Sequence, residues 1–155
     1  MTQSPIINPQ LDRVAVYQRS VPVSLERVWE NVLDWEHLPW LHDSSFLDAE
    51  VIEAGQWGWR AKLGIPPAKG KRREIELELL IDDSGDRYVS RTTRGQGAGT
   101  EIWTTLEAQG SERTGVAIEF WLPDVPPDKA AALGTRFTQL YTKLWDEDEH
   151  MMTRR

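Results

Sequence analysis

Residues 74–79 read Glu-Ile-Glu-Leu-Glu-Leu, a strict alternation of charged and apolar side chains. Because successive side chains of a β-strand point to opposite faces of the sheet, this pattern predicts a strand. Ile75, Leu77 and Leu79 are expected on its buried face, with the three glutamates in water. No other stretch of the chain carries so clear a strand signal.

Weaker strand signals lie on both sides of this stretch. Short segments rich in Gly, Asp and Pro separate them, and connections of hairpin length imply an antiparallel meander. With residues 74–79 included, seven strands are expected, over residues 13–21, 46–53, 57–63, 74–79, 87–93, 101–108 and 115–122.

Helical spacing of apolar residues appears in two regions. After the first strand, Ser24 is a suitable N-cap for a helix over residues 25–34, and a second short helical turn is expected over residues 36–41. The longest predicted element begins after Pro127. An antiparallel sheet with helices on one face is an α+β architecture. The apolar face of the long helix contains Ala130, Leu133, Phe137, Leu140, Tyr141, Leu144 and Trp145.

The size and composition of the chain fit one globular domain. Its 155 residues are 39% hydrophobic and 28% charged, which is ordinary for a globular protein that buries a core. We expect residues 1–11 to form an N-terminal arm and residues 12–155 a single domain. Eight Trp residues are unusual in so short a chain and indicate either an aromatic core or a cavity lined by indoles.

Several functional classes are disfavoured by composition. The chain has no Cys, which removes disulfides, thiol nucleophiles and cysteine zinc sites and is compatible with a cytoplasmic location. Its start lacks the charged and apolar pattern of a signal peptide or membrane anchor. The net charge of −7 argues against nucleic acid as the main partner, so we expect neither nucleic-acid binding nor integral membrane contact.

Two stretches carry a resemblance to a known superfamily. Residues 21–29 read Val-Pro-Val-Ser-Leu-Glu-Arg-Val-Trp, and residues 35–42 read Trp-Glu-His-Leu-Pro-Trp-Leu-His. With the order of predicted elements, they resemble the START-like, Bet v 1-like (SRPBCC) superfamily, which includes polyketide cyclases. The resemblance extends from Asp12 onward. It implies a helix-grip fold, in which a curved antiparallel sheet wraps a long C-terminal helix around a cavity for apolar molecules.

If such a cavity is present, aromatic and apolar side chains of the strands and helices would line it. Strand alternation leaves open which face of residues 101–108 and 115–122 points inward, because Trp103 is out of phase with Ile102 and Thr104. The ligand-binding candidates are Trp40, Trp59, Leu77, Trp103, Phe120, Phe137 and Tyr141.

The sequence gives weaker indications of catalytic or metal-binding residues. His37 and His42 are five residues apart, which does not place both imidazoles on one helical face, so no metal site and no cofactor are predicted. His42 near the mouth of the implied pocket is a candidate acid or base. Arg91 and Tyr141 are the other catalytic candidates, and Arg91 points either to solvent or into the pocket.

Three functions are compatible with these observations. The first is binding of a hydrophobic or aromatic small molecule in an internal cavity between the sheet and the long helix. The second is an enzyme of the polyketide cyclase or aromatase type, with His42, Arg91 or Tyr141 moving protons. The third is a homodimer or partner-binding protein that uses the exposed face of the sheet. The sequence does not choose between them, because a fold does not specify a function.

Overall fold

The computed structural model describes residues 5, 7–42, 45–68 and 71–154, without the side chains of residues 39–40, 67–68 and 71–72. In chain order the elements are β1 (Asp12–Val21), α1 (Leu25–Leu33), α2 (His37–Leu41), β2 (Asp48–Gly55), β3 (Gly58–Ala68), β4 (Lys71–Ile81), β5 (Arg87–Arg94), β6 (Glu101–Ala108), β7 (Thr114–Leu122) and α3 (Ala130–Met152).

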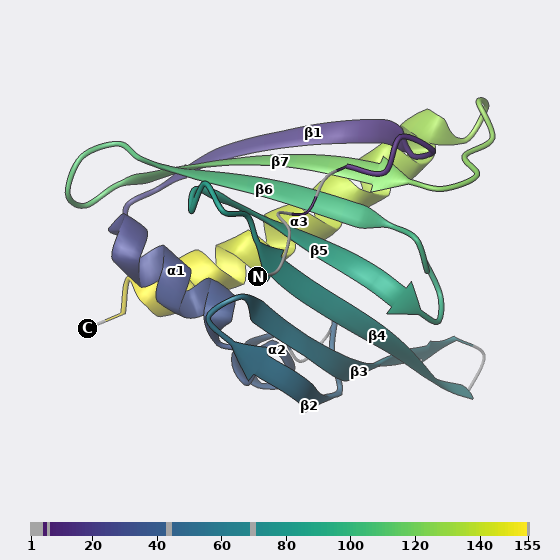
Figure 1. The fold of residues 1–155 in the computed structure, drawn as a ribbon, viewed down its shortest axis with the longest axis horizontal. Helices are drawn as coiled ribbons and strands as arrows, with labels where there is room; N and C mark the ends of the chain where they lie inside the picture. Colours follow the sequence, from purple (N-terminus) through teal and green to yellow (C-terminus); the bar gives the residue numbers. More distant parts are fainter. Residues whose placement is uncertain (1–4, 6, 43–44, 69–70, 155) are drawn as a thin grey trace.

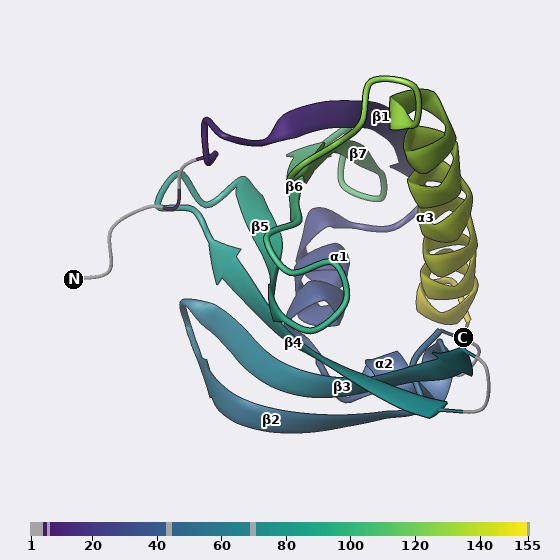
Figure 2. The same ribbon diagram turned by 90° about the vertical axis from the view of Figure 1, so that its right-hand side faces the viewer.

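Among the described residues, seven strands form one antiparallel sheet in the order β1-β7-β6-β5-β4-β3-β2. Register irregularities interrupt the ladders between β1 and β7, β2 and β3, β3 and β4, and β4 and β5. Irregularities of this kind bend a sheet. Figures 1 and 2 show a strongly curved sheet with α3 across its open side. The predicted antiparallel sheet and long C-terminal helix are therefore confirmed.

The segment between β1 and β2 differs from the expected pair of short helices. The nine-residue α1 begins as predicted at Ser24, whose hydroxyl oxygen accepts a hydrogen bond from the Arg27 amide at 3.3 Å. The five-residue α2 is little more than one helical turn. Of the described residues in this segment, α1 alone forms a helix longer than two turns.

The long helix α3 packs against the sheet through aromatic side chains and a glycine. Phe120 of β7 is fully buried, with ring centroids 5.4 Å from Phe137 and 5.0 Å from Tyr141. Gly134 lies so close to β1 that a Cβ atom there would be 2.3 Å from the carbonyl oxygen of Val14. This close approach holds one end of the helix against the sheet, and the pocket lies farther along α3.

The glutamates of β4 on the outer face of the sheet are less exposed than alternation alone predicted. Glu74 is exposed as expected, but Glu76 and Glu78 are only partly exposed. Arg60 lies opposite Glu78 in the β3–β4 register, and their side chains form an ion pair of 3.1 Å. The expectation that all three glutamates stand in water is thus wrong for Glu76 and Glu78. Arg60 and Arg91 pair with Glu78, and Arg94 pairs with Glu76.

The described part of the N-terminal segment contacts the domain. Leu11 is buried, and the backbone amide of Asn8 donates to Glu101 Oε1 at 3.4 Å. The division at residues 11 and 12 stays a prediction. None of the helices in the described ranges has the length and apolar character needed to cross a bilayer.

Candidate functional site

Two adjoining chambers lie between the concave face of the sheet and the helices in the described part of the chain. The inner chamber has a volume of about 110 Å³ and the outer chamber about 440 Å³. Both are lined mainly by apolar side chains. They share the wall residues Phe46, Leu77, Ser90, Ile102, Tyr141 and Leu144, so the two chambers are adjacent, and together they are called the two-part pocket below.

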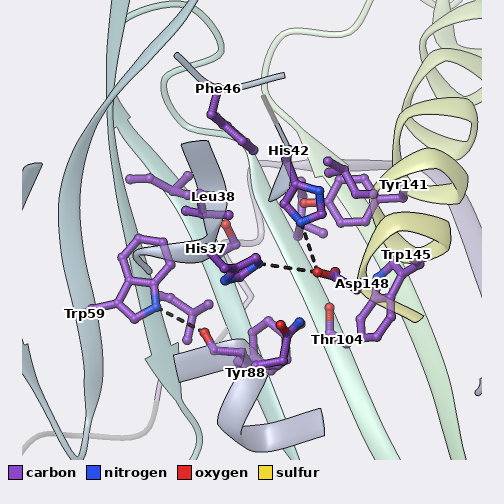
Figure 3. A pocket seen from close by; sticks show the side chains of 17 residues that line it. His37, Leu38, His42, Phe46, Trp59, Tyr88, Thr104, Tyr141, Trp145 and Asp148 are labelled. Carbon is purple, nitrogen blue, oxygen red and sulfur yellow. Dashed lines mark hydrogen bonds and ion pairs between the residues drawn. The ribbon is translucent and has the colours of Figure 1, made fainter. Parts of the chain in front are cut away.

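Aromatic side chains form much of the wall of the inner chamber. Trp59 of β3 is 3% exposed, and its indole N–H donates to the backbone oxygen of Val32 in α1 at 3.2 Å. Trp145 of α3 closes the opposite side, as Figure 3 shows. Because the hydrogen bond fixes its indole ring, Trp59 presents an apolar surface to the chamber.

Three titratable side chains meet in the inner chamber. His37 opens α2, His42 follows its last residue, and Asp148 comes from α3 more than a hundred residues later. They are 9%, 1% and 7% exposed. Asp148 Oδ1 lies 3.0 Å from His42 Nε2 and 3.4 Å from His37 Nε2. Figure 3 shows both imidazoles directed at this carboxylate.

The second nitrogen of each imidazole also has an oxygen neighbour. His37 Nδ1 hydrogen-bonds the backbone oxygen of Asp34. His42 Nδ1 lies 3.0 Å from Glu147 Oε1. Each imidazole ring is thus oriented by the contact at its Nδ1, and its Nε2 faces Asp148.

Burial and charge act in opposite directions on these groups. Burial alone would lower the pKa of His42, but its hydrogen bonds with Asp148 and Glu147 and their negative charges raise that pKa above the ordinary value. Burial alone would raise the pKa of Asp148, but hydrogen bonds with His37 and His42 outweigh it and lower that pKa to about 2. Asp148 is therefore ionised at physiological pH beside the two imidazoles.

Two tyrosines add hydroxyl groups to the same chamber. Burial raises the pKa of Tyr88 and of Tyr141 well above that of an exposed phenol. Both stay neutral at physiological pH, so Tyr141 as positioned is a hydrogen-bonding group and not a ready base.

The structure brings several of the sequence candidates together at this pocket. Trp59 and His42 line the inner chamber, Phe137 lines the outer chamber, and Leu77 and Tyr141 line both. These placements agree with the predicted location, whereas contact with a ligand stays a prediction.

Other candidates lie elsewhere. Phe120 is fully buried in the core against Phe137 and Tyr141, outside the lining of both chambers. Trp103 and Arg91 are on the opposite face of the sheet, where the Arg91 side chain lies 6.0 Å from the Trp103 ring centroid. The Trp103 indole N–H and Arg91 Nε both donate to Glu101, at 3.0 and 3.1 Å. The side chain of Trp40 lies outside what the structure describes.

Alternation of side chains along β6 explains the position of Trp103. Ile102 and Thr104 line the inner chamber, so alternation directs Trp103 to the other face. The sequence left this choice of face open. The packing of α3 determines it: the helix covers the concave face of the sheet, and Ile102 and Thr104 point toward that face.

Sequence reasoning missed Asp148 as a site residue. It belongs to the acidic run 146–149, which is typical of a solvated helix face. Helical spacing contained a usable signal, because Asp148 lies seven, four and three residues after Tyr141, Leu144 and Trp145 of the predicted apolar face. A carboxylate at that position is directed toward the pocket and not to solvent.

Comparison with solved structures identifies the fold. A START superfamily protein from Mycobacterium smegmatis superposes with a TM-score of 0.73 at 13% identity, over 90% of this chain and 98% of that one. An aromatase/cyclase from a Streptomyces species gives 0.66 at 14% identity, over 90% of each chain. Norcoclaurine synthase from Thalictrum flavum gives 0.65 at 15% identity, over 97% of this chain and 99% of that one.

The chain thus has the START/Bet v 1-like helix-grip fold, which confirms at the level of fold the resemblance seen in its sequence. No protein-family model and no curated protein sequence matches it. At identities this low the superpositions identify the fold alone, and function has to be argued from the pocket.

Proposed function

We propose that this protein binds an apolar or aromatic small molecule in the two-part pocket between the sheet and α3. The observation that carries the proposal is the outer chamber, whose volume of about 440 Å³ lies within the range of small-molecule sites. The inner chamber extends it toward His42 and Asp148. A ligand would place its larger apolar part in the outer chamber and a smaller end in the inner one.

The lining of the outer chamber supports an apolar ligand with a polar edge. Ile75, Leu77, Phe137 and Leu144 offer apolar and aromatic contact area. Burial of ligand surface against such residues contributes about 25 cal/mol per Å², before the cost of association. Polar side chains in the same lining, among them Gln96, could orient a hydroxyl or carboxylate of the ligand.

Among the solved structures of similar fold, one holds norcoclaurine synthase with dopamine and hydroxybenzaldehyde. Small aromatic ligands of that kind are of a size that the outer chamber could contain. The similarity supports the chemical class of the ligand and does not identify it.

The proposal is tested by a matched pair of substitutions on β5. Thr92 lines the outer chamber, whereas its neighbour Thr93 is exposed on the other face. Thr92→Phe adds bulk inside the chamber, and Thr93→Phe adds the same bulk outside it. Binding of palmitate, testosterone and quercetin would be measured by isothermal titration calorimetry.

We expect at least one of these three probes to bind the wild-type protein one to one. Thr92→Phe should weaken that binding by at least about tenfold, since the added ring occupies chamber volume. Thr93→Phe should leave it within about twofold. Equal effects of the two substitutions, or no binding of any probe, would refute the proposal. Circular dichroism of both variants checks that the fold is retained.

Catalytic turnover of the polyketide cyclase or aromatase type stays a prediction, as do a dimeric function and a cytoplasmic location. Mass spectrometry of a bound probe after incubation separates binding from conversion, because an enzyme returns a changed molecule and a carrier returns the same one.

A further inference from the structure

The cluster of His37, His42 and Asp148 has the composition and arrangement of a metal site. Each residue offers one ligand atom, and these atoms all lie within 4.8 Å of one another. We propose that the three side chains bind one divalent transition-metal ion, such as Fe²⁺, Zn²⁺ or Co²⁺, in the wall of the inner chamber. The sequence predicted no metal site, so this inference departs from that expectation.

The distances fit ligands that share one ion. With metal–ligand bonds of about 2.1 Å, neighbouring ligand atoms are about 3.0 Å apart in octahedral and about 3.4 Å apart in tetrahedral geometry. Asp148 Oδ1 is 3.0 Å from His42 Nε2 and 3.4 Å from His37 Nε2. All three ligand atoms lie within 4.8 Å of one another, so the two imidazoles have to approach each other by at most about 2 Å for one ion to bind all three.

The hydrogen-bond contacts of the Nδ1 atoms of both imidazoles are also typical of metal-binding histidines. Metal-binding histidines usually donate the other ring N–H to a carboxylate or a backbone carbonyl, which fixes the tautomer. His37 Nδ1 hydrogen-bonds the backbone oxygen of Asp34, and His42 Nδ1 faces Glu147 Oε1 at 3.0 Å. A neutral imidazole held in this way directs the lone pair of Nε2 toward Asp148.

An imidazole nitrogen and a carboxylate oxygen this close cannot both present lone pairs to each other. Either a ring N–H hydrogen or a metal ion must therefore lie between them. Two neutral histidines and one carboxylate form the ligand set that is typical of non-haem iron enzymes, and a closely related set occurs in catalytic zinc sites. A divalent ion at this position would replace the N–H hydrogens that otherwise lie between the imidazoles and Asp148.

A second observation points to a further ligand at this place. Asn31 lines the same chamber and is 4% exposed, and its Oδ1 has no hydrogen-bond partner among the described residues. Buried acceptors of this kind are rare in native proteins and call for an explanation. Three protein ligands leave coordination positions open, and a water molecule on the ion would offer a donor within the chamber.

The metal site extends the pocket but does not depend on the proposed organic ligand. Metal binding is measured with the ion alone, so failure of either proposal leaves the other standing. If both hold, the ion lies at the inner end of the pocket, where it could contact the part of a ligand that enters from the outer chamber.

The test begins with chelator-treated wild-type protein under anaerobic conditions. Titration with Co²⁺ would be followed by visible absorption, and Zn²⁺ and Fe²⁺ would then be added as competitors. Variants His37→Gln and Asp148→Asn each remove one ligand. His150→Gln is the matched control, because His150 is on α3 close to Asp148 but exposed.

We expect one ion per wild-type chain. His37→Gln and Asp148→Asn should each weaken binding by about 100-fold or more, since loss of an outer partner alone costs 10–100-fold. His150→Gln should change the affinity less than twofold. Glu147→Gln, which alters the partner of His42, should fall between these limits.

Absence of one-to-one binding would overturn the proposal, and so would equal affinity in the wild type and in both ligand variants. A measurement on the wild type decides the case if the variants do not fold. Nitrogen-15 NMR of the imidazoles should show Nε2 of His37 and His42 changing on addition of Zn²⁺ while His150 does not. Unchanged His37 and His42 signals at saturating Zn²⁺ would also overturn it.

Discussion

Substitution of Gly134 by alanine tests whether the close packing of α3 against β1 depends on the absence of a side chain at this position. In an isolated helix, replacing glycine by alanine stabilises the helical state by about 1 kcal/mol, because glycine is a poor helix former. Here the added Cβ would lie 2.3 Å from the carbonyl oxygen of Val14 and 3.2 Å from the Cβ of Ala15. The nearest atom belongs to the backbone and cannot rotate away, so the helix or the strand has to move.

The packing cost should exceed the gain in helix propensity. Overpacking of a well-packed contact costs about 1–3 kcal/mol, and a backbone neighbour favours the upper part of that range. We therefore expect Gly134→Ala to lower the free energy of unfolding by about 1–2 kcal/mol. For a domain of this size the midpoint of thermal unfolding should fall by about 2–8 °C.

Urea and thermal unfolding followed by far-ultraviolet circular dichroism would measure both quantities. Thr135→Ala is the control, since Thr135 is exposed on the same helix and its hydroxyl donates a hydrogen bond within that helix, to the Ala131 carbonyl at 3.0 Å. That variant should be unchanged or more stable by a few tenths of a kcal/mol. A Gly134→Ala protein about 1 kcal/mol more stable than the wild type would refute the proposed close packing.

Three further outcomes follow from the contacts around the pocket. Trp59→Phe removes the donor to the buried Val32 carbonyl and should lower the free energy of unfolding by about 1–3 kcal/mol in urea; an unaltered midpoint would count against this hydrogen bond. Phe120→Ala should cost about 3–5 kcal/mol by the same measurement, because it removes a fully buried ring of β7 that packs against Phe137 and Tyr141 of α3, and a loss below 1 kcal/mol would contradict that packing. In chelator-treated protein the pKa of Asp148 is about 2, below the ordinary 3.8, so its stabilisation is present above pH 4 and is lost as the pH falls toward 2. Asp148→Asn should lack this component of the acid transition in pH-dependent unfolding, and identical acid profiles would disprove it.

The sequence by itself determined the order of elements and most of their limits. Alternation over residues 74–79 and helical spacing after Pro127 are local signals, because side-chain direction repeats every two residues in a strand and about every 3.6 in a helix. Such signals also placed Leu77 and Phe137 on faces that turned out to border the pocket. They could not determine which face of β6 is covered, because both Trp103 and its neighbours Ile102 and Thr104 are compatible with burial.

Tertiary structure alone decided the composition of the site. His42 and Asp148 are separated by 106 positions, and their contact exists only because α3 crosses the open side of the curved sheet and passes α2. No local periodicity encodes that distance, since it depends on the bend of the sheet and on how closely Gly134 lets the helix approach β1. The sequence supplied the two imidazoles and the carboxylate, and the packing of the helix against the sheet brought them together.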